Sequence, residues 1–220
     1  MTTVAETVDP PERNDLAPQR RLRIPVPSLV VLVGASGAGK STFARRWFPD
    51  SSILSSDALR AELGRGEADQ RVSRRAFEIL HRDLAARLER RELTIVDATN
   101  IEPHARRALL ARRPTPDRAG GEPTFEPIRA IAIVLDVAAA GVHARNAARP
   151  GRVVPADVVD RQLAALRQSA TDEHLRAEGF DAIHRLIDPA AIDGVALAVT
   201  AGERLDVIHE PVLPAPLGQV

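Results

Sequence analysis

The sequence contains no cysteine, and aromatic residues make up only 3% of its 220 residues. The lack of cysteine excludes a disulfide framework, a thiolate zinc site and a cysteine nucleophile. No apolar run approaches the roughly 18 residues that a membrane-spanning helix needs, and the first residues lack the apolar segment of a secretory signal. The 30 basic and 30 acidic residues balance, so net charge indicates neither nucleic acid nor membrane as a partner. We therefore expect a soluble, cytoplasmic protein that does not bind membranes.

Lysine is almost absent as well. Of the 30 basic residues 29 are arginine, and Lys40 is the only lysine. A chain that uses arginine almost everywhere keeps a lysine where a compact ammonium is needed and a planar guanidinium does not fit. The alternative is that this single lysine has been retained by chance. The motif that contains Lys40 argues against that alternative.

Residues 34–41, with the sequence GASGAGKS, match the phosphate-binding pattern GxxxxGK[ST] between an apolar run and a helical segment. Glycines in such a loop let the backbone turn its N–H groups toward phosphate oxygens, and the following helix adds its positive N-terminal end. Lys40 would reach the β- and γ-phosphates of ATP, and the Ser41 hydroxyl would bind Mg²⁺. The expected ATP-binding residues are Gly34, Ala35, Ser36, Gly37, Ala38, Gly39, Lys40, Ser41 and Thr42.

Other P-loop classes are excluded by what is missing. A chain whose only lysine lies in the phosphate loop cannot contain the NKxD base-reading segment of GTPases. It also lacks an LSGGQ-like signature of transporter ATPases, and it is short for a mechanical ATPase. A small phosphotransferase is the class that remains.

Short apolar strands alternate with helical segments, which predicts an α/β fold in which helices cover both faces of a parallel sheet. This is the P-loop NTPase fold, here with an arginine-rich lid. A long amphipathic helix is expected over 71–91, with its apolar face formed by Phe77, Leu80, Leu84 and Leu88. Pro155 is expected at the first position of a later helix, with Asp157 behind it. The expected strands are 29–33, 52–55, 94–96, 128–137, 181–187 and 195–199.

The composition divides the chain into three parts. Residues 1–27 are rich in proline and are expected to form a disordered leader. Residues 28–200 are expected to form the P-loop domain, with polar loops at 64–70 and 113–127, and residues 201–220 a loose tail.

Two carboxylates are candidates for chemistry. Asp57 follows the second expected strand, where a doubly wound sheet opens its cleft, and Arg60 projects on the same side one helical turn later. Asp57 could act as a general base or as a helix N-cap, and the two roles do not exclude each other. Asp97 ends an apolar strand, as a magnesium-binding acid would. Thr99 and Asn100 follow it, and turn chemistry accounts for both.

The lid is expected in a segment that holds Arg145, Arg149 and Arg152 and no acid. Such arginines can close over phosphates and stabilise the charge of a transition state, although a solvated surface would show the same pattern. Three further candidates show no metal-ligand spacing and are interpreted as core or surface histidines, namely His81, His104 and His143.

With these residues considered together, the chain resembles the 5′-OH polynucleotide kinases, in particular the kinase module of bacterial polynucleotide kinase-phosphatases, and predicted kinases of the AAA type. The similarity lies in GASGAGKST, SSDALR, IVDATN and HARNAARPGRVVP, which anchor residues 29–168. The resemblance implies that Asp57 is the general base for the 5′-hydroxyl and that Arg60 holds the acceptor phosphate. It also implies that Arg145 and Arg149 embrace ATP. The first two motifs also occur in small-molecule kinases.

The expected activity is transfer of the γ-phosphoryl group of ATP, with Mg²⁺, to a hydroxyl. The favoured acceptor is the 5′-hydroxyl of DNA or RNA. A small alcohol such as a sugar acid, an antibiotic or a nucleoside-like molecule is the alternative, because it needs neither a basic groove nor aromatic residues for stacking. A nucleotide-binding regulatory module without catalysis is a third interpretation.

Overall fold

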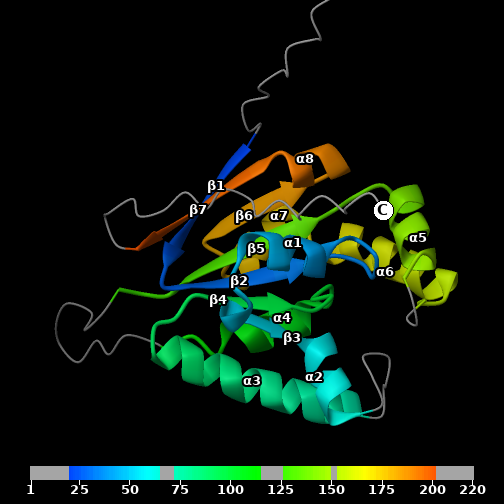
Figure 1. Cartoon of the computed structure of the whole chain (residues 1–220). Helices are drawn as coiled ribbons and strands as arrows, with labels where there is room; N and C mark the ends of the chain where they lie inside the picture. Colours follow the sequence, from blue (N-terminus) through cyan, green and yellow to red (C-terminus); the bar gives the residue numbers. More distant parts are fainter. Residues whose placement is uncertain (1–19, 65–71, 115–125, 150–152, 202–220) are drawn as a thin grey trace, which may run out of the picture.

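The computed structural model describes residues 20–64, 72–114, 126–149 and 153–201 (Figure 1). The expectations for residues 1–19, 65–71, 115–125 and 202–220, and for Arg152, concern positions outside these ranges. Within the described part of the chain, no helix is both long and apolar enough to cross a bilayer.

Five parallel strands form the central sheet. They are β2 (Ser28–Val33), β3 (Ile53–Ser55), β4 (Thr94–Asp97), β5 (Arg129–Leu135) and β6 (Ala182–Leu186). Their order across the sheet is β3-β4-β2-β5-β6, so β2 is the central strand. All of β2 is buried, and so is all of β5 after its first residue, which explains why both strands are unbroken apolar runs. The predicted parallel α/β sheet is confirmed.

Helices cover both faces of the sheet, as expected. They are α1 (Lys40–Trp47), α2 (Ser56–Leu63), α3 (Ser73–Glu89), α4 (Pro103–Leu110), α5 (Ala139–Ala147), α6 (Ala156–Ser169), α7 (Asp172–Glu178) and α8 (Pro189–Asp193), with a 3₁₀ turn, η1 (Asp50–Ser52), before β3. Successive β2 residues point to opposite faces. Val30 and Leu32 lie in one core with α1 and α5, whereas Leu29 and Val31 lie in another with α3, α4 and α7.

A second sheet consists of two parallel strands, β1 (Arg20–Val26) and β7 (Val195–Ala201) (Figure 1). The expectation that residues 1–27 form a disordered leader is therefore wrong for residues 20–26. Leu22 and Ile24 are buried in the core beside α1 and alternate with other residues, which is the pattern of a half-buried strand. The prolines at 25 and 27 favoured the prediction of a disordered segment, but proline is tolerated in an edge strand.

Helix α3 lies where it was predicted, but its buried face differs by one residue. The structure buries Ala76 together with Leu80, Leu84 and Leu88, a strict four-residue spacing. The placement of Phe77 in the core is wrong, because 39% of its surface is exposed. The small alanine beside it packs into the core in its place.

Smaller differences concern the helices near the C-terminal end of the domain. Pro155 is the N-cap of α6 and not its first residue, while Asp157 lies in the first turn as predicted. Helices α7 and α8 were not predicted, since they span only seven and five residues. Elements of one or two turns give too little periodicity to detect.

Arg106 on α4 is fully buried and connects three parts of the fold. Its guanidinium donates to both carboxylate oxygens of Glu178 on α7, at 2.7 and 2.6 Å. It also donates to the carbonyl oxygens of Asn100 at 3.0 Å, of Ser169 at 2.7 Å and of Ile101. The guanidinium thus joins the segment after β4 to α6 and α7.

We expect Arg106→Met to lower the free energy of unfolding by about 3–5 kcal/mol, because it leaves the carboxylate of Glu178 buried and unpaired. Urea denaturation measures this change. Arg161→Met is the matched control, since Arg161 pairs with Asp157 on the surface and its loss should change stability by at most about 1 kcal/mol. An equally small loss for Arg106→Met would contradict the role given to this ion pair.

Candidate active site

The phosphate loop joins β2 to α1 at the carboxyl edge of the sheet. Gly37 and Gly39 have φ angles of +86° and +101°, which side chains disfavour. Lys40 Nζ donates to the carbonyl oxygens of Gly34 at 2.8 Å and Ala35 at 2.9 Å, so the ammonium lies against the loop that precedes it. Ser41 is half-buried in the first turn of α1, and Thr42 after it is exposed. The predicted strand–loop–helix context is confirmed.

The start of the loop is held by the segment after β4. The Gly34 N–H donates to the Thr99 carbonyl at 3.0 Å. Asn100 adopts a left-handed backbone with φ of +48°, and its side-chain amide donates to the Leu32 carbonyl at 2.8 Å. Thr99 and Asn100 therefore position the loop, and the interpretation of Asn100 as a turn residue is confirmed.

The predicted lid helix α5 lies directly against the phosphate loop. A Cβ atom on Gly37 would lie 2.7 Å from the Val142 carbonyl oxygen and 3.1 Å from Asn146 Cβ. The Asn146 side chain in turn donates to the Val154 carbonyl at 2.7 Å and accepts from its N–H at 3.1 Å. These contacts fix the position of α5 relative to the loop.

We expect Gly37→Ala to weaken ATP binding by at least about tenfold, because the left-handed backbone and the approach of α5 both resist a Cβ atom. Isothermal titration calorimetry measures the affinity. Gly141→Ala is the matched control: it adds the same methyl group to α5, where the nearest atom is the Arg145 guanidinium at 3.6 Å. Equal affinities for both variants would show that the loop tolerates a side chain at position 37.

Two lid arginines can be placed. Arg145 Nε donates to the Gly37 carbonyl at 2.9 Å, and its Nη2 is buried without a hydrogen-bond partner among the described residues. Arg149 is half-buried in the turn after α5, and Arg152 lies outside the described ranges. A buried unsatisfied donor beside a phosphate loop is the group that a phosphate oxygen would satisfy. This feature fits a nucleotide in the loop.

Asp57 and Arg60 form an ion pair on α2. The N-cap of this helix is Ser55, whose hydroxyl accepts from the Ala58 N–H, so the alternative role of Asp57 as N-cap is wrong. Of the two side chains, 21% of Asp57 and 8% of Arg60 is exposed, so the guanidinium is buried and the carboxylate is reachable from solvent. The pair stands just beyond β3, at the carboxyl edge of the sheet.

Asp97 ends β4 and lies in register between Leu32 of β2 and Ser55 of β3. Only 4% of its surface is exposed, and it forms no ion pair with any residue in the described ranges. A buried carboxylate is normally paired or bound to a metal. The hydroxyl of Ser41 and the carboxylate of Asp97 are hard oxygen ligands, the donor set that suits Mg²⁺.

Gln162 was missed by the sequence analysis. Its side-chain oxygen, on α6, accepts a hydrogen bond from the Ser36 N–H in the phosphate loop at 2.8 Å. Among the three histidines set aside earlier, His143 of α5 contacts Asp160 of α6 at 2.8 Å. These contacts connect α5 to α6 and α6 to the loop. The bond between Ser36 and Gln162 joins residues that are 126 positions apart, so no local sequence signal indicates it.

The fold and the loop together define a nucleotide-binding P-loop domain of the kinase-like class. The chain belongs to the AAA domain family, which matches residues 29–172. Among curated proteins no significant match is found.

The chain is also similar to several solved structures. A chain of the Pnkp1/Rnl/Hen1 RNA repair complex is 21% identical with a TM-score of 0.50, over 66% of this chain and 45% of that chain. Shikimate kinase from Acinetobacter baumannii is 19% identical with a TM-score of 0.45, over 76% and 87% of the two chains. Gluconokinase from Sinorhizobium meliloti 1021 is 18% identical with a TM-score of 0.43, over 76% and 86%. This chain covers less than half of the RNA repair chain, and at 21% identity that similarity shows the fold alone.

Proposed function

We propose that this protein transfers the γ-phosphoryl group of ATP to the 5′-hydroxyl of a DNA or RNA end. The observation that carries the proposal is the ion pair of Asp57 and Arg60 at the carboxyl edge of the sheet that bears the phosphate loop. A carboxylate can accept the proton of an attacking hydroxyl, and a guanidinium beside it can hold an anionic group of the same molecule. A terminal nucleotide offers both, since it has a 5′-hydroxyl and a 3′-phosphate.

The nucleotide half of the reaction depends on the loop and the lid. The loop N–H groups and the Lys40 ammonium would hold the phosphates of ATP, and Arg145 and Arg149 would close over them. Ser41 and Asp97 are the residues that would hold Mg²⁺, which would supply positive charge to offset that of the phosphates. These groups stabilise the charge that spreads over the transferring phosphoryl group.

The acceptor half depends on α2. The Asp57 carboxylate would accept the proton of the 5′-hydroxyl as its oxygen bonds to the γ-phosphorus, while the bond from that phosphorus to the ADP oxygen breaks. Arg60 would orient the acceptor through its phosphate, so the hydroxyl reaches the γ-phosphorus in line. The similarity of all four motifs to 5′-OH polynucleotide kinases favours a nucleic-acid end as this acceptor.

A small anionic alcohol is the second candidate. The guanidinium of Arg60 fits a carboxylate as well as a phosphate, so a sugar acid satisfies the same pair. This acceptor needs no contact beyond the cleft, and its turnover should depend little on ionic strength. Binding of a nucleic-acid strand should instead weaken steeply as salt rises.

The test is an acceptor comparison with ATP labelled in the γ-phosphate, in the presence of Mg²⁺. The proposal expects label on 5′-OH DNA or RNA oligonucleotides and none on the same oligonucleotides already carrying a 5′-phosphate. Label on a sugar acid or another small alcohol, with none on either oligonucleotide, would replace the proposal with the second candidate. Binding of ATP with no labelled product would favour the regulatory module.

A further inference from the structure

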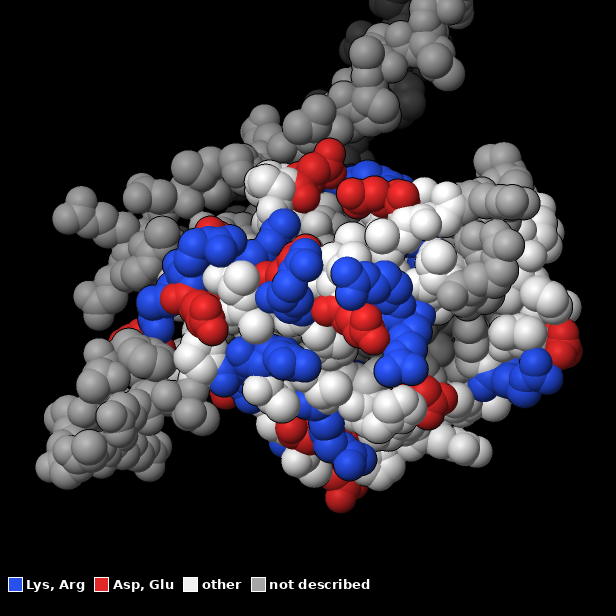
Figure 2. All heavy atoms as spheres, turned by 90° about the horizontal axis from the view of Figure 1, so that it is seen from below, with Lys and Arg blue, Asp and Glu red and all other residues white. Residues whose placement is uncertain are grey.

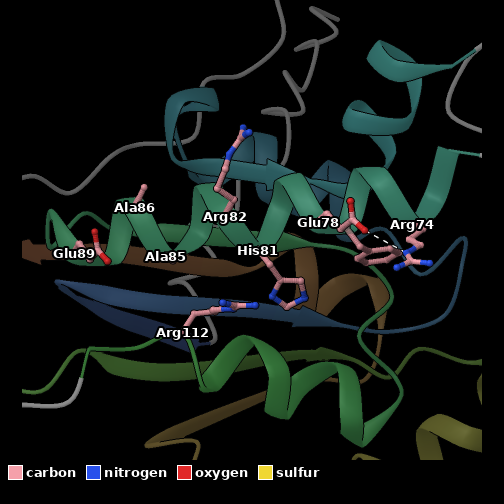
Figure 3. Close-up of a pocket in the computed structure, with 9 residues that line it drawn as sticks. Arg74, Glu78, His81, Arg82, Ala85, Ala86, Glu89 and Arg112 are labelled. Carbon is pink, nitrogen blue, oxygen red and sulfur yellow. Dashed lines mark hydrogen bonds and ion pairs between the residues drawn. The ribbon is translucent and has the colours of Figure 1, made fainter.

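A groove of about 750 Å³ lies along α3 and is also lined by Arg112 (Figure 3). Its lining residues recur at helical spacing from Arg74 to Glu89, a length of roughly 22 Å along the helix axis. Its other wall is Arg112, in the turn after α4, which points toward His81 of α3 (Figure 3). None of the residues assigned to the active site lines it.

The groove combines cations with an exposed aromatic ring. Three arginines and two glutamates line it. Glu78 is paired with Arg74 at 3.2 Å and with Arg75, outside the lining, at 3.4 Å, and Arg82 is paired with Asp83, also outside the lining, at 2.8 Å. Arg112 forms no ion pair within the described ranges. The ring of Phe77 is 39% exposed, although large apolar side chains are normally buried. Figure 2, viewed from the side of α3, shows blue basic residues spread over this face among fewer red acidic ones.

His81 adds a second flat ring. Its Nδ1 is buried without a hydrogen-bond partner among the described residues. Burial first, and the charge of Arg112 second, lower the pKa of His81, which favours the neutral imidazole. The imidazole therefore lies beside the Arg112 guanidinium as a second ring in the groove lining.

The groove also begins at the end of the molecule where the proposed catalytic residues lie. Helix α3 runs antiparallel to the strands, so its first turns, which hold Arg74 and Phe77, lie toward the carboxyl edge of the sheet (Figure 1). Helix α2, which carries Asp57, contacts α3. A strand whose 5′ end reaches Asp57 can therefore continue along α3.

We propose that the α3 groove binds single-stranded nucleic acid, with a base stacked on Phe77 and with Arg82 and Arg112 against the phosphates. Stacking on an aromatic ring and contact of arginine with phosphate are the two elements of sequence-independent strand binding. The direction of the strand rests on the proposed function, but binding itself is measurable without catalysis. The groove would also provide a surface for base stacking, although the sequence contains few aromatic residues.

The experiment measures fluorescence anisotropy of a labelled oligonucleotide of about 12 nucleotides, a length within the range of known single-strand sites. The proteins are the full chain, Phe77→Ala, and the double variant Arg82→Glu with Arg112→Glu. The matched control reverses two surface charges on other helices, Arg161→Glu with Arg176→Glu. Transfer to a 3′-phosphorylated mononucleoside is measured with each.

We expect Phe77→Ala to weaken strand binding by about 5- to 150-fold, the equivalent of one lost stacking contact. The groove double variant should lose at least about tenfold and show a shallower dependence on salt, and the control should stay within about twofold. Both groove variants should keep turnover of the mononucleoside. Strand binding with these dependences but no transfer by the full chain would refute the proposed function and leave the groove proposal standing.

Three results would overturn the groove proposal: no strand binding by the full chain, equal affinity in the groove variants and the full chain, or tighter binding of polyglutamate than of the oligonucleotide. The last would identify the surface as one for acidic protein segments.

Discussion

Lys40→Ala is expected to slow phosphoryl transfer by about 10²–10⁴-fold, because the variant loses the one ammonium that can neutralise charge on the transferring group. Transfer of labelled phosphate under saturating ATP measures the rate. In the structure Lys40 Nζ already lies within 2.9 Å of two loop carbonyl oxygens, so the side chain is held at the loop. Near-normal turnover would remove Lys40 from the mechanism.

Lys40→Arg is the stricter companion variant, since it keeps the positive charge. We expect Lys40→Arg to slow phosphoryl transfer almost as much as Lys40→Ala, because a planar guanidinium does not fit between the loop carbonyls and a phosphate. The chain uses arginine for its other 29 basic residues, which makes this comparison informative. Recovery of activity by Lys40→Arg would mean that the single lysine is a chance survivor. Thermal unfolding checks that both variants fold.

Asp57→Asn is expected to slow transfer by about 10²–10⁴-fold while ATP affinity stays unchanged, because it removes a general base and keeps the shape of the side chain. The asparagine oxygen can still accept from Arg60, so the buried guanidinium keeps a partner. Single-turnover transfer and calorimetry separate the two effects.

Glu62→Gln is the control for Asp57→Asn, because Glu62 is an exposed carboxylate on the same helix. It should leave transfer unchanged. If both variants lose activity equally, the effect is one of charge on α2 and not of a base at position 57. If neither loses activity, Asp57 serves only to hold Arg60.

The sequence was most informative where chemistry and local structure coincide. The phosphate loop needs glycines, a lysine and a hydroxyl at fixed spacing between a strand and a helix, and that combination predicted the P-loop fold. The buried strands were found because parallel sheets covered on both faces give unbroken apolar runs. Asp57 and Asp97 were predicted as site residues because ligands bind at the carboxyl ends of such strands.

The rest depended on contacts between distant segments. Nothing near Gln162 indicates that its side chain reaches the Ser36 N–H, and nothing near Arg106 distinguishes it from 28 other arginines. Strand β1 forms its ladder of hydrogen bonds with β7, which lies about 175 residues later in the chain. Such features follow from tertiary packing, which local periodicity does not encode.

The central claim is that the protein transfers the γ-phosphoryl group of ATP to a 5′-hydroxyl at Asp57. The most direct measurement follows labelled γ-phosphate in a reaction with a 5′-OH oligonucleotide and counts ADP formed against phosphate on the strand. We predict one phosphate on the strand for each ADP formed. This phosphate should be released by phosphatase and recovered on the 5′-terminal nucleotide after nuclease digestion. ADP formed at the same rate with the label in inorganic phosphate would contradict it, because the site would then activate water.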